Sequence, residues 1–192
     1  DTSVFSKSNN LFSLNFAKNQ NNGQLILCEG YMDVIALHQA GFENAVATLV
    51  TAVTAQQARL MARYAKEIII AYDGDAAGQT ATKKATQLLV EAGLSVKVLR
   101  IPNGKDPDEY IQQYGKDRFS LLLQASKDHV EYRLAQIKSN YNLDIPLQKA
   151  AFLNSASEYI ASLESPIERD IYLSRLSLEY AVSKDALQAM TK

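Results

Sequence analysis

Short hydrophobic runs alternate with helix-length stretches over the first hundred residues of the chain. The stretches 32–40, 54–65 and 76–92 are long enough for helices, and Gly41 and Gly93 follow two of them as helix-ending residues. Strands that alternate with helices predict an α/β fold whose parallel sheet is built from right-handed crossovers. The runs with the length and residue types of strands are LILC (25–28), AVATL (45–49), EIIIAY (67–72) and SVKVLR (95–100).

After Pro107 the pattern is helical to the end of the chain. The sequence SPIE (165–168) is typical of a helix start, with Ser165 as the N-cap and Pro166 at the first helical position. We predict about three helices over 127–192 and a final short helix that begins at Ser183. The predicted domains are therefore a segment, 1–22, that is the tail of a preceding subdomain, an α/β domain over 23–126 and a helical subdomain over 127–192.

Composition narrows the class of protein. With 192 residues and 47% hydrophobic residues, the chain can bury one core, or a core and a small satellite. A single cysteine, Cys28, excludes an internal disulfide, and with only two histidines a zinc site is not expected in this chain. No hydrophobic run approaches the ~18 residues that span a bilayer, and no signal peptide is evident. We expect a cytoplasmic protein that does not bind membranes.

The net charge of −1 argues against strong, non-specific binding of nucleic acid by this chain alone. A role at a nucleic acid stays open if another part of the protein supplies the phosphate contacts.

Carboxylates follow the predicted strands. Glu29 follows the first strand, Asp73 and Asp75 follow the third, and Asp106 and Asp108 follow the fourth. These positions lie at the carboxyl edge of a parallel sheet, where such folds bind their ligands. Asp33, on the opening turn of the first helix, could reach the same edge.

Six carboxylates around one crevice would raise one another's pKa, and a divalent cation would relieve the repulsion. Oxygen ligands suit Mg²⁺, and two ions about 3.5–4 Å apart are usual in phosphoryl transfer. Asp73 and Asp75, two residues apart on extended backbone, would point the same way. The sequence contains neither a phosphate-binding GxxxxGK[ST] loop nor a dinucleotide fingerprint.

Each carboxylate also has a purely structural alternative. Asp106 precedes Pro107 as a helix N-cap would, Asp75 could cap the helix after it, and Glu29 could be a solvated loop residue. Lys105 fits a solvated loop better than a phosphate contact. Because three acidic positions lie at the same edge of the sheet, a ligand-binding site is favoured over three independent structural roles.

The motifs resemble a known family. A glutamate after one strand and a DxD after a later one is the Toprim pattern. The segments EGYMDVIALHQAG, YDGDAAGQ and GKDPDEYI, in this order, resemble the catalytic core of bacterial DnaG-type primases. VFSKSNNLFSLNFAK resembles the segment that leads into their Toprim domain, and the closing helices resemble their helical subdomain. The resemblance covers nearly the whole chain and implies a Toprim-type catalytic domain over 23–126.

The resemblance implies synthesis of short RNA primers on single-stranded DNA by two-metal nucleotidyl transfer, with Mg²⁺ or Mn²⁺, in DNA replication. Glu29, Asp73 and Asp75 would be the catalytic metal ligands, directly or through water. Asp33, Asp106 and Asp108 would be supporting ligands. Lys7 matches a basic position that faces the template or nucleotide, and Lys105 is a second candidate contact.

The resemblance also implies partners and further domains. The substrates would be a single-stranded DNA template and ribonucleoside triphosphates, and the protein would act as a monomer. The replicative helicase would bind through a C-terminal domain outside this chain, and a zinc site would lie in a domain before it. Without these parts we expect the chain alone to be inactive or weakly active.

Two stretches depart from the family pattern. Leu49-Val50-Thr51 stands where the family commonly has Leu-Gly-Thr, and Lys7-Ser8-Asn9 stands where it has Lys-Gly-Arg. The valine would narrow the site, and the lost arginine would remove a phosphate or base contact.

Three other functions remain open. They are a non-catalytic Toprim scaffold, a Toprim nuclease with manganese-dependent cleavage, and a phosphohydrolase whose nucleophilic aspartate beryllium fluoride would trap.

Overall fold

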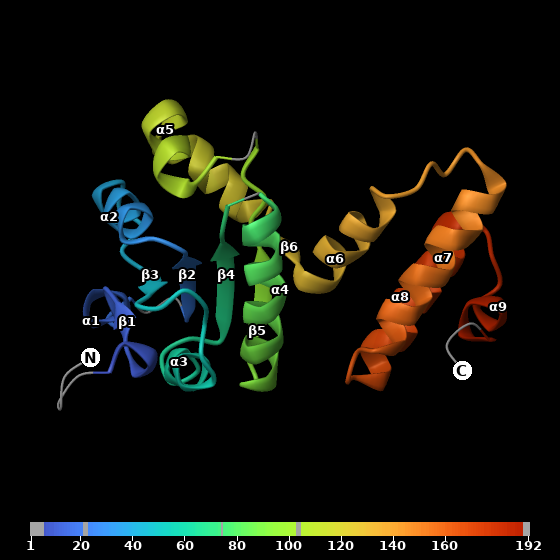
Figure 1. Cartoon of the computed structure of the whole chain (residues 1–192), viewed down its shortest axis with the longest axis horizontal. Coiled ribbons are helices and arrows are strands. Elements are labelled where there is room, and N and C mark those ends of the chain that lie inside the picture. The colour runs from blue at the N-terminus through green and yellow to red at the C-terminus, as the bar shows by residue number, and fades with distance from the viewer. Residues whose placement is uncertain (1–5, 21–22, 74, 103–104, 190–192) are drawn as a thin grey trace. The chain divides into compact units, whose positions relative to one another are not determined.

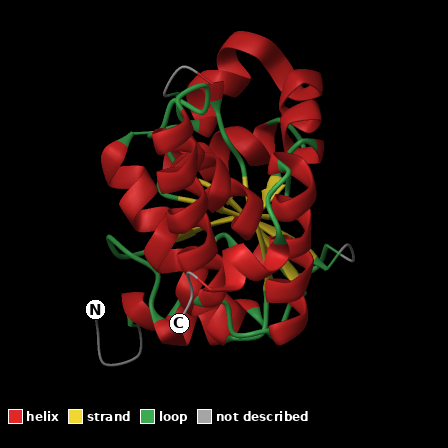
Figure 2. Cartoon of the chain, turned by 90° about the vertical axis from the view of Figure 1, so that its right-hand side faces the viewer, coloured by secondary structure: helices red, strands yellow, loops and turns green. Residues whose placement is uncertain are grey.

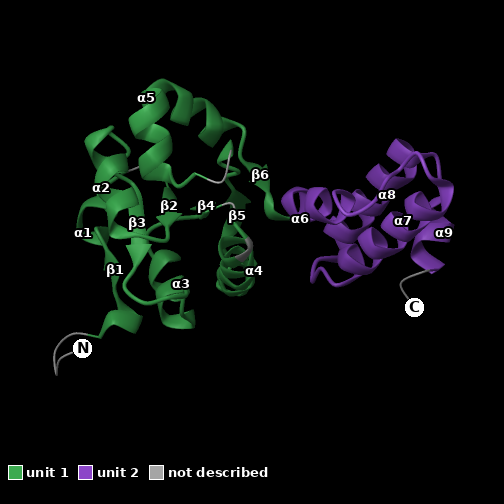
Figure 3. Cartoon of the chain, turned by 45° about the horizontal axis from the view of Figure 1, so that its top comes forward, with its two compact units in different colours: residues 1–129 green, residues 130–192 purple. Residues whose placement is uncertain are grey.

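The computed structural model describes residues 6–20, 23–73, 75–102 and 105–189. The chain divides into two compact units, residues 1–129 and 130–192 (Figure 3). Helices, red in Figure 2, make up most of the described elements. The subdivision into 1–22, 23–126 and 127–192 stays a prediction, and residues 1–5 and 21–22 of its first segment lie outside the described residues.

Among the described residues, six strands of the first unit form one sheet in the order β1-β3-β2-β4-β5-β6 (Figure 1). The strands β2, β3, β4 and β5 pair in parallel, which confirms the predicted α/β fold. β1 and β6 pair antiparallel at the edges, and the sequence did not predict them because two residues are too few to show a period. The strands are β1 (Leu11–Phe12), β2 (Gln24–Cys28), β3 (Ala45–Thr48), β4 (Glu67–Ala71), β5 (Ser95–Val98) and β6 (Lys127–Asp128).

Helices cover both faces of the sheet because successive strand residues point to opposite faces. Leu27 and Ile70 pack on the face covered by α3 (Ala55–Met61) and α4 (Ala76–Glu91). Ile26 and Ile69 pack on the face covered by α2 (Tyr31–Gln39) and α5 (Pro107–Gln124). The continuous run of isoleucines in β4 therefore reflects burial on both faces.

The helix α5 is interrupted at Gly115, whose φ of 77° lies in the left-handed region that glycine adopts most easily. The chain continues as a second helical segment, from which Phe119 is fully buried against Phe42. The N-terminal segment adds a 3₁₀ turn, η1 (Lys7–Asn9), and a short helix, α1 (Leu14–Ala17).

The second unit contains the helices that the periodicity predicted. They are α6 (His129–Lys138), α7 (Pro146–Ala161), α8 (Pro166–Tyr180) and α9 (Lys184–Ala189). Ser165 caps α8 by accepting a hydrogen bond from the Glu168 N–H at 3.3 Å, as its SPIE sequence predicted. Phe152, Ile160 and Leu176 belong to its own hydrophobic core. No described helix is both long enough and apolar enough to cross a bilayer.

Candidate active site

The sheet register brings the acidic loops together. Cys28, the last residue of β2, pairs with Ala71, the last residue of the neighbouring β4. The chain therefore leaves both strands at the same level, and Glu29 lies close enough to Asp73 to interact with it. β5 pairs with β4 up to Val98, so the loop that leads to Asp106 begins at the same edge (Figure 1).

Glu29 is directed at the loop after β4. Desolvation is the main cause that raises the pKa of its carboxyl group, and the charges of Asp73 and Asp75 raise it further. A hydrogen bond from the Asp73 backbone opposes this rise by stabilising the ionised form. Glu29 thus interacts with both the backbone and the side chains of the DxD segment.

Asp73 lies at the centre of the group. Desolvation raises its pKa, and the charges of Asp106, Asp75 and Glu109 raise it further. Asp106 and Glu109 lie at the start of α5 and Asp75 belongs to the DxD segment itself, so negative side chains from two segments act on this half-buried carboxylate. Such mutual repulsion is the electrostatic signature that the sequence predicted for this edge.

Asp33 links the first acidic loop to the last. Its side chain is buried, with 6% exposed, and its Oδ2 accepts a hydrogen bond from the Gly30 N–H at 3.1 Å. Its Oδ1 accepts from the Asp108 N–H at 3.3 Å. Burial raises the pKa of Asp33 to about 6; the two backbone hydrogen bonds oppose the rise, and the charges of Asp106 and Asp73 add to it.

Asp75 and Asp106 cap helices, as their structural alternatives predicted. Asp75 accepts a hydrogen bond from the Gly78 N–H at 2.7 Å at the start of α4. Asp106 accepts one from the Glu109 N–H at 2.7 Å at the start of α5. Each bond occupies one carboxylate oxygen and places the charge at the positive end of a helix. Each cap uses only one of the two carboxylate oxygens.

The other predicted residues take different positions. The Asp108 carboxylate accepts a hydrogen bond from Gln112 of its own helix at 2.6 Å, and the backbone N–H of Asp108 donates one to the Asp33 carboxylate. Lys105 is half-buried directly before Asp106, and Lys7 lies exposed in η1. Val50, in the loop after β3, is half-buried, and its carbonyl accepts from Thr48 at 2.6 Å. The roles of these residues in binding stay predictions.

Two residues of the site were not found from the sequence. Glu109, in the first turn of α5, adds to the negative charge around Asp73. Gly78 allows close approach: a Cβ there would lie 2.1 Å from the Asp73 carbonyl oxygen and 3.1 Å from the Glu29 Oε1. The glycine in DGDAAG was the available signal, but its neighbours across the fold are visible only in three dimensions.

The donor atoms of this edge fit a hard divalent cation. They are carboxylate oxygens, and a positive ion would offset the burial and the repulsion that together raise the pKa of Glu29, Asp33 and Asp73. Among the described residues, no three histidine, cysteine or acidic side chains lie close enough to hold an ion as they stand.

A parallel-stranded core with a glutamate after one strand and a DxD after its neighbour defines a Toprim-class domain. A family model described as Toprim-like matches residues 26–111, and one described as the DnaB-helicase binding domain of primase matches 130–185.

DNA primases are the relatives of this chain. It is 40% identical over 188 residues to the DNA primase of Clostridium acetobutylicum, which is 97% of this chain and 31% of that protein. It is 37% identical over 189 residues to the DNA primase of Geobacillus stearothermophilus, covering 97% of this chain and 32% of that protein. The chain thus spans about a third of the length of these relatives.

Solved primase structures share the fold. The Aquifex aeolicus primase, with its zinc-binding and RNA polymerase domains, matches with a TM-score of 0.77 and 34% identity, over 97% of this chain and 45% of that one. A DnaG primase catalytic domain bound to ssDNA matches with a TM-score of 0.78 and 27% identity, over 97% and 61% of the two chains. The chain belongs to the bacterial DnaG-type DNA primase family, as its motifs predicted.

The family-model match over residues 130–185 differs from the expectation about where the helicase binds. The sequence predicted helicase contact only through a C-terminal domain outside the chain, whereas the description of this model names helicase binding for a segment within it. Helical periodicity shows which face is buried and not which partner covers the other face, so the pattern had indicated only a packed bundle.

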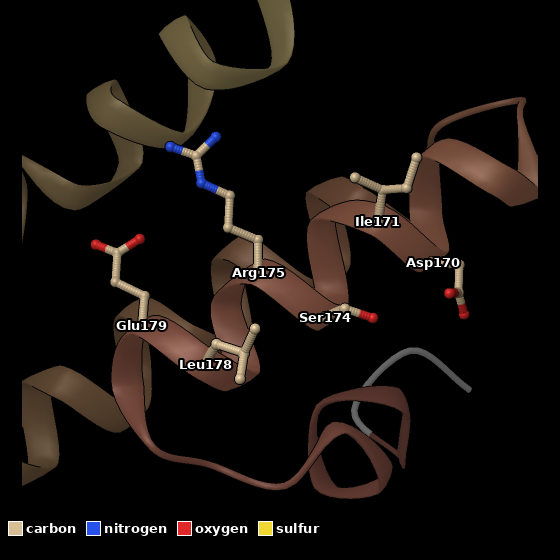
Figure 4. A pocket seen from close by; sticks show the side chains of 6 residues that line it. All are labelled: Asp170, Ile171, Ser174, Arg175, Leu178 and Glu179. Atoms are coloured by element: carbon tan, nitrogen blue, oxygen red, sulfur yellow. The ribbon is translucent and has the colours of Figure 1, made fainter.

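The second unit has an open hollow on α8. Its volume is about 670 Å³, and it is lined by Asp170, Ile171, Ser174, Arg175, Leu178 and Glu179 (Figure 4). Three large apolar side chains of this helix are unusually exposed, at 73% for Ile167, 58% for Ile171 and 84% for Leu178. This face is a second candidate site.

Gly78→Ala is expected to lower the free energy of unfolding by about 1–3 kcal/mol, because the new Cβ must displace the Asp73 backbone. The loss should appear even though alanine is the better helix former by about 1 kcal/mol. Urea unfolding followed by circular dichroism measures it. Lys84→Ala, at an exposed position of α4, is the control and should change stability by less than about 0.5 kcal/mol. A Gly78→Ala variant as stable as the parent would contradict the close approach.

Asp33→Asn is expected to gain stability relative to the parent as the pH rises from about 4 to 7. The pKa of Asp33 is raised in the folded chain to about 6. Between its ordinary value and 6, the folded chain therefore binds more protons than the unfolded chain, and this carboxyl group lowers the free energy of unfolding with rising pH. The free energy of unfolding of Asp33→Asn, relative to that of the parent, should therefore rise by up to about 3 kcal/mol between pH 4 and pH 7.

Urea midpoints at pH 4 and 7 test this expectation. Asp117→Asn, at an exposed position of α5, is the matched control. A stability difference between Asp33→Asn and the parent that stays constant with pH would show that the environment of Asp33 is not as described.

Proposed function

We propose that this chain is the catalytic segment of a primase, a nucleotidyltransferase that joins ribonucleotides into short RNA primers on a single-stranded DNA template. The observation that carries the proposal is the electrostatic coupling of Glu29, Asp73 and Asp75 at the ends of neighbouring strands. Membership of the primase family supports the reaction type. Because the chain spans about a third of its relatives, the activity belongs to a longer protein.

Glu29, Asp73 and Asp75 would hold two Mg²⁺ or Mn²⁺ ions, with Asp33, Asp106 and Asp108 in support. Bound there, the ions would lower the pKa of the primer 3′-hydroxyl group and neutralise charge on the triphosphate and on the leaving pyrophosphate. The backbone hydrogen bonds to Glu29, Asp75 and Asp106 orient their carboxylates before any ligand arrives. Lys7 and Lys105 would contact phosphates of the nucleotide or template.

The charge of the chain limits its share of nucleic-acid binding. Each phosphate contact by lysine or arginine adds affinity through counterion release, and a chain of net charge −1 has little surplus for this. We therefore propose that other parts of the protein provide most of the contacts with the template. A monomeric state and a cytoplasmic location remain part of the proposal.

The test is a chimera in which this chain replaces the matching segment of the Clostridium acetobutylicum primase, to which it is 40% identical. We expect the chimera to extend labelled ribonucleotides into primers on single-stranded DNA with Mg²⁺ or Mn²⁺. Asp73→Asn should reduce primer yield at least about a hundredfold, since it removes a ligand and its charge. Asp117→Asn, at an exposed position of α5, should leave the yield unchanged.

The alternatives give different results in the same assay. A folded chimera that makes no primers, or in which Asp73→Asn has no effect, would refute catalysis by this site and leave the scaffold function. Manganese-dependent cleavage of the DNA, lost in Asp73→Asn, would instead identify a nuclease.

We further propose that the second unit contacts the replicative helicase. The description of the family model over 130–185 supports this partner, and the exposed apolar side chains of α8 offer a surface for it. Leu178, which is 84% exposed and lines the hollow, buries little of its side chain within its own unit. Apolar side chains that a partner covers commonly contribute a large share of binding energy.

Leu178→Asp is expected to weaken binding of a DnaB-type helicase at least about tenfold, as measured by biolayer interferometry with immobilised helicase. Leu121→Asp is the matched control: this leucine is 58% exposed but lies on α5, outside residues 130–185. Equal affinities for the parent and Leu178→Asp would exclude this face of α8 from the interface.

A further inference from the structure

The turn that carries Lys7 lies at the same edge of the sheet as the carboxylates. β1 pairs antiparallel with β3, and its first residue, Leu11, pairs with Thr48, the last residue of β3. The chain just before Leu11 therefore lies beyond the carboxyl end of β3. This stretch contains the 3₁₀ turn η1 (Lys7–Asn9) and lies beside the start of α3.

A buried amide of α3 holds this turn. Gln57 is fully buried, and its Nε2 donates hydrogen bonds to the carbonyls of Lys7 at 3.1 Å and Asn10 at 2.8 Å. Its Oε1 accepts from the Thr54 N–H at 3.1 Å. Both N–H groups and the oxygen of the amide are thus used, so burial of this polar side chain leaves none of its atoms unsatisfied.

Thr54 adds a parallel contact. Its hydroxyl group donates to the Ser8 carbonyl at 2.6 Å and accepts from the Gln57 N–H at 3.1 Å. Gln57 and Thr54, at the start of α3, therefore bind three backbone carbonyls in and next to the turn, those of Lys7, Ser8 and Asn10. A buried amide that lost these partners would be destabilised by about 1–3 kcal/mol, so the arrangement strongly favours one position of the turn.

Recognition through carbonyls does not depend on the side chains of the turn. Ser8 and Asn9 are the positions at which the sequence departs from the family pattern, and the contacts of Gln57 and Thr54 use neither side chain. The turn is also closed internally, because the Asn10 side-chain amide donates to the Ser6 carbonyl at 2.8 Å. The contacts that hold the backbone around Lys7 against α3 therefore do not depend on the side chains of Ser8 and Asn9.

We infer that Gln57 is a positioning residue that holds the Lys7 turn against the start of α3 and thereby presents Lys7 at the carboxyl edge of the sheet. The importance of this position for catalysis rests on the proposed function, in which Lys7 contacts the nucleotide or template. The inference about the turn itself rests on the hydrogen bonds alone.

Trypsin cleavage after Lys7 tests the inference without any nucleic acid. Cleavage requires the turn to leave α3, because the Lys7 carbonyl is held by Gln57. Gln57→Met keeps the side-chain length but has no hydrogen-bond donor, and should speed cleavage after Lys7 at least about tenfold. Gln56→Met, at the exposed neighbouring position, is the matched control and should not change the rate.

Circular dichroism shows whether each variant is folded. Should Gln57→Met not fold, Gln57→Glu serves instead, since it keeps an acceptor for the Thr54 N–H but cannot donate to the turn. A folded Gln57 variant cleaved within twofold of the parent rate would overturn the inference.

A second readout separates positioning from general stability. In the primase chimera, Gln57→Met should raise KM for the nucleotide or template by the same factor as Lys7→Ala and leave kcat unchanged. Combined with Lys7→Ala it should add nothing, because both changes remove one contact. Faster cleavage with an unchanged KM would support the positioning of the turn and refute only the proposed contact by Lys7. A Gln57→Met effect that persists in full beside Lys7→Ala would overturn positioning through Lys7.

Discussion

Repulsion between carboxylates at one edge of the sheet is the constraint on which the site depends. The equal ends of β2 and β4 place Glu29 next to Asp73, and the loop after β5 brings Asp106 to the same group. Free carboxylates in water would move apart to reduce this repulsion. Here they cannot, because the strands that carry them would lose the buried core on both faces of the sheet. The fold therefore holds the carboxylates in an arrangement that a divalent cation would stabilise.

Backbone N–H groups make this arrangement tolerable in the absence of an ion. Asp75 and Asp106 accept hydrogen bonds at helix starts, and Asp33 accepts two. The structural and the functional interpretation of these residues are therefore not alternatives, because the same bond that starts a helix also fixes the direction of a carboxylate. Backbone groups likewise hold the basic turn, where Gln57 and Thr54 bind carbonyls and leave the Lys7 side chain exposed.

Much of the fold could be predicted from the sequence, and the reasons are local. Hydrophobic runs of strand length and the stretches between them indicated β2, β3, β4 and β5 with their helices, and SPIE marked the start of α8. The two-residue strands β1 and β6 exist only through pairing with distant partners, so no local pattern indicated them. The break at Gly115 was also missed, since one glycine in a helical pattern does not reveal its φ.

The sequence by itself determined the α/β class, the family and the set of acidic side chains at the ends of the strands, because these depend on residue type and spacing. Only the tertiary structure decided what each side chain meets. It placed Asp33 on the backbone of Asp108, Glu109 beside Asp73, and the α-carbon of Gly78 against the Asp73 carbonyl. These neighbours are separated along the chain by anything from a few to 75 residues, and the paths of the strands and loops bring them together.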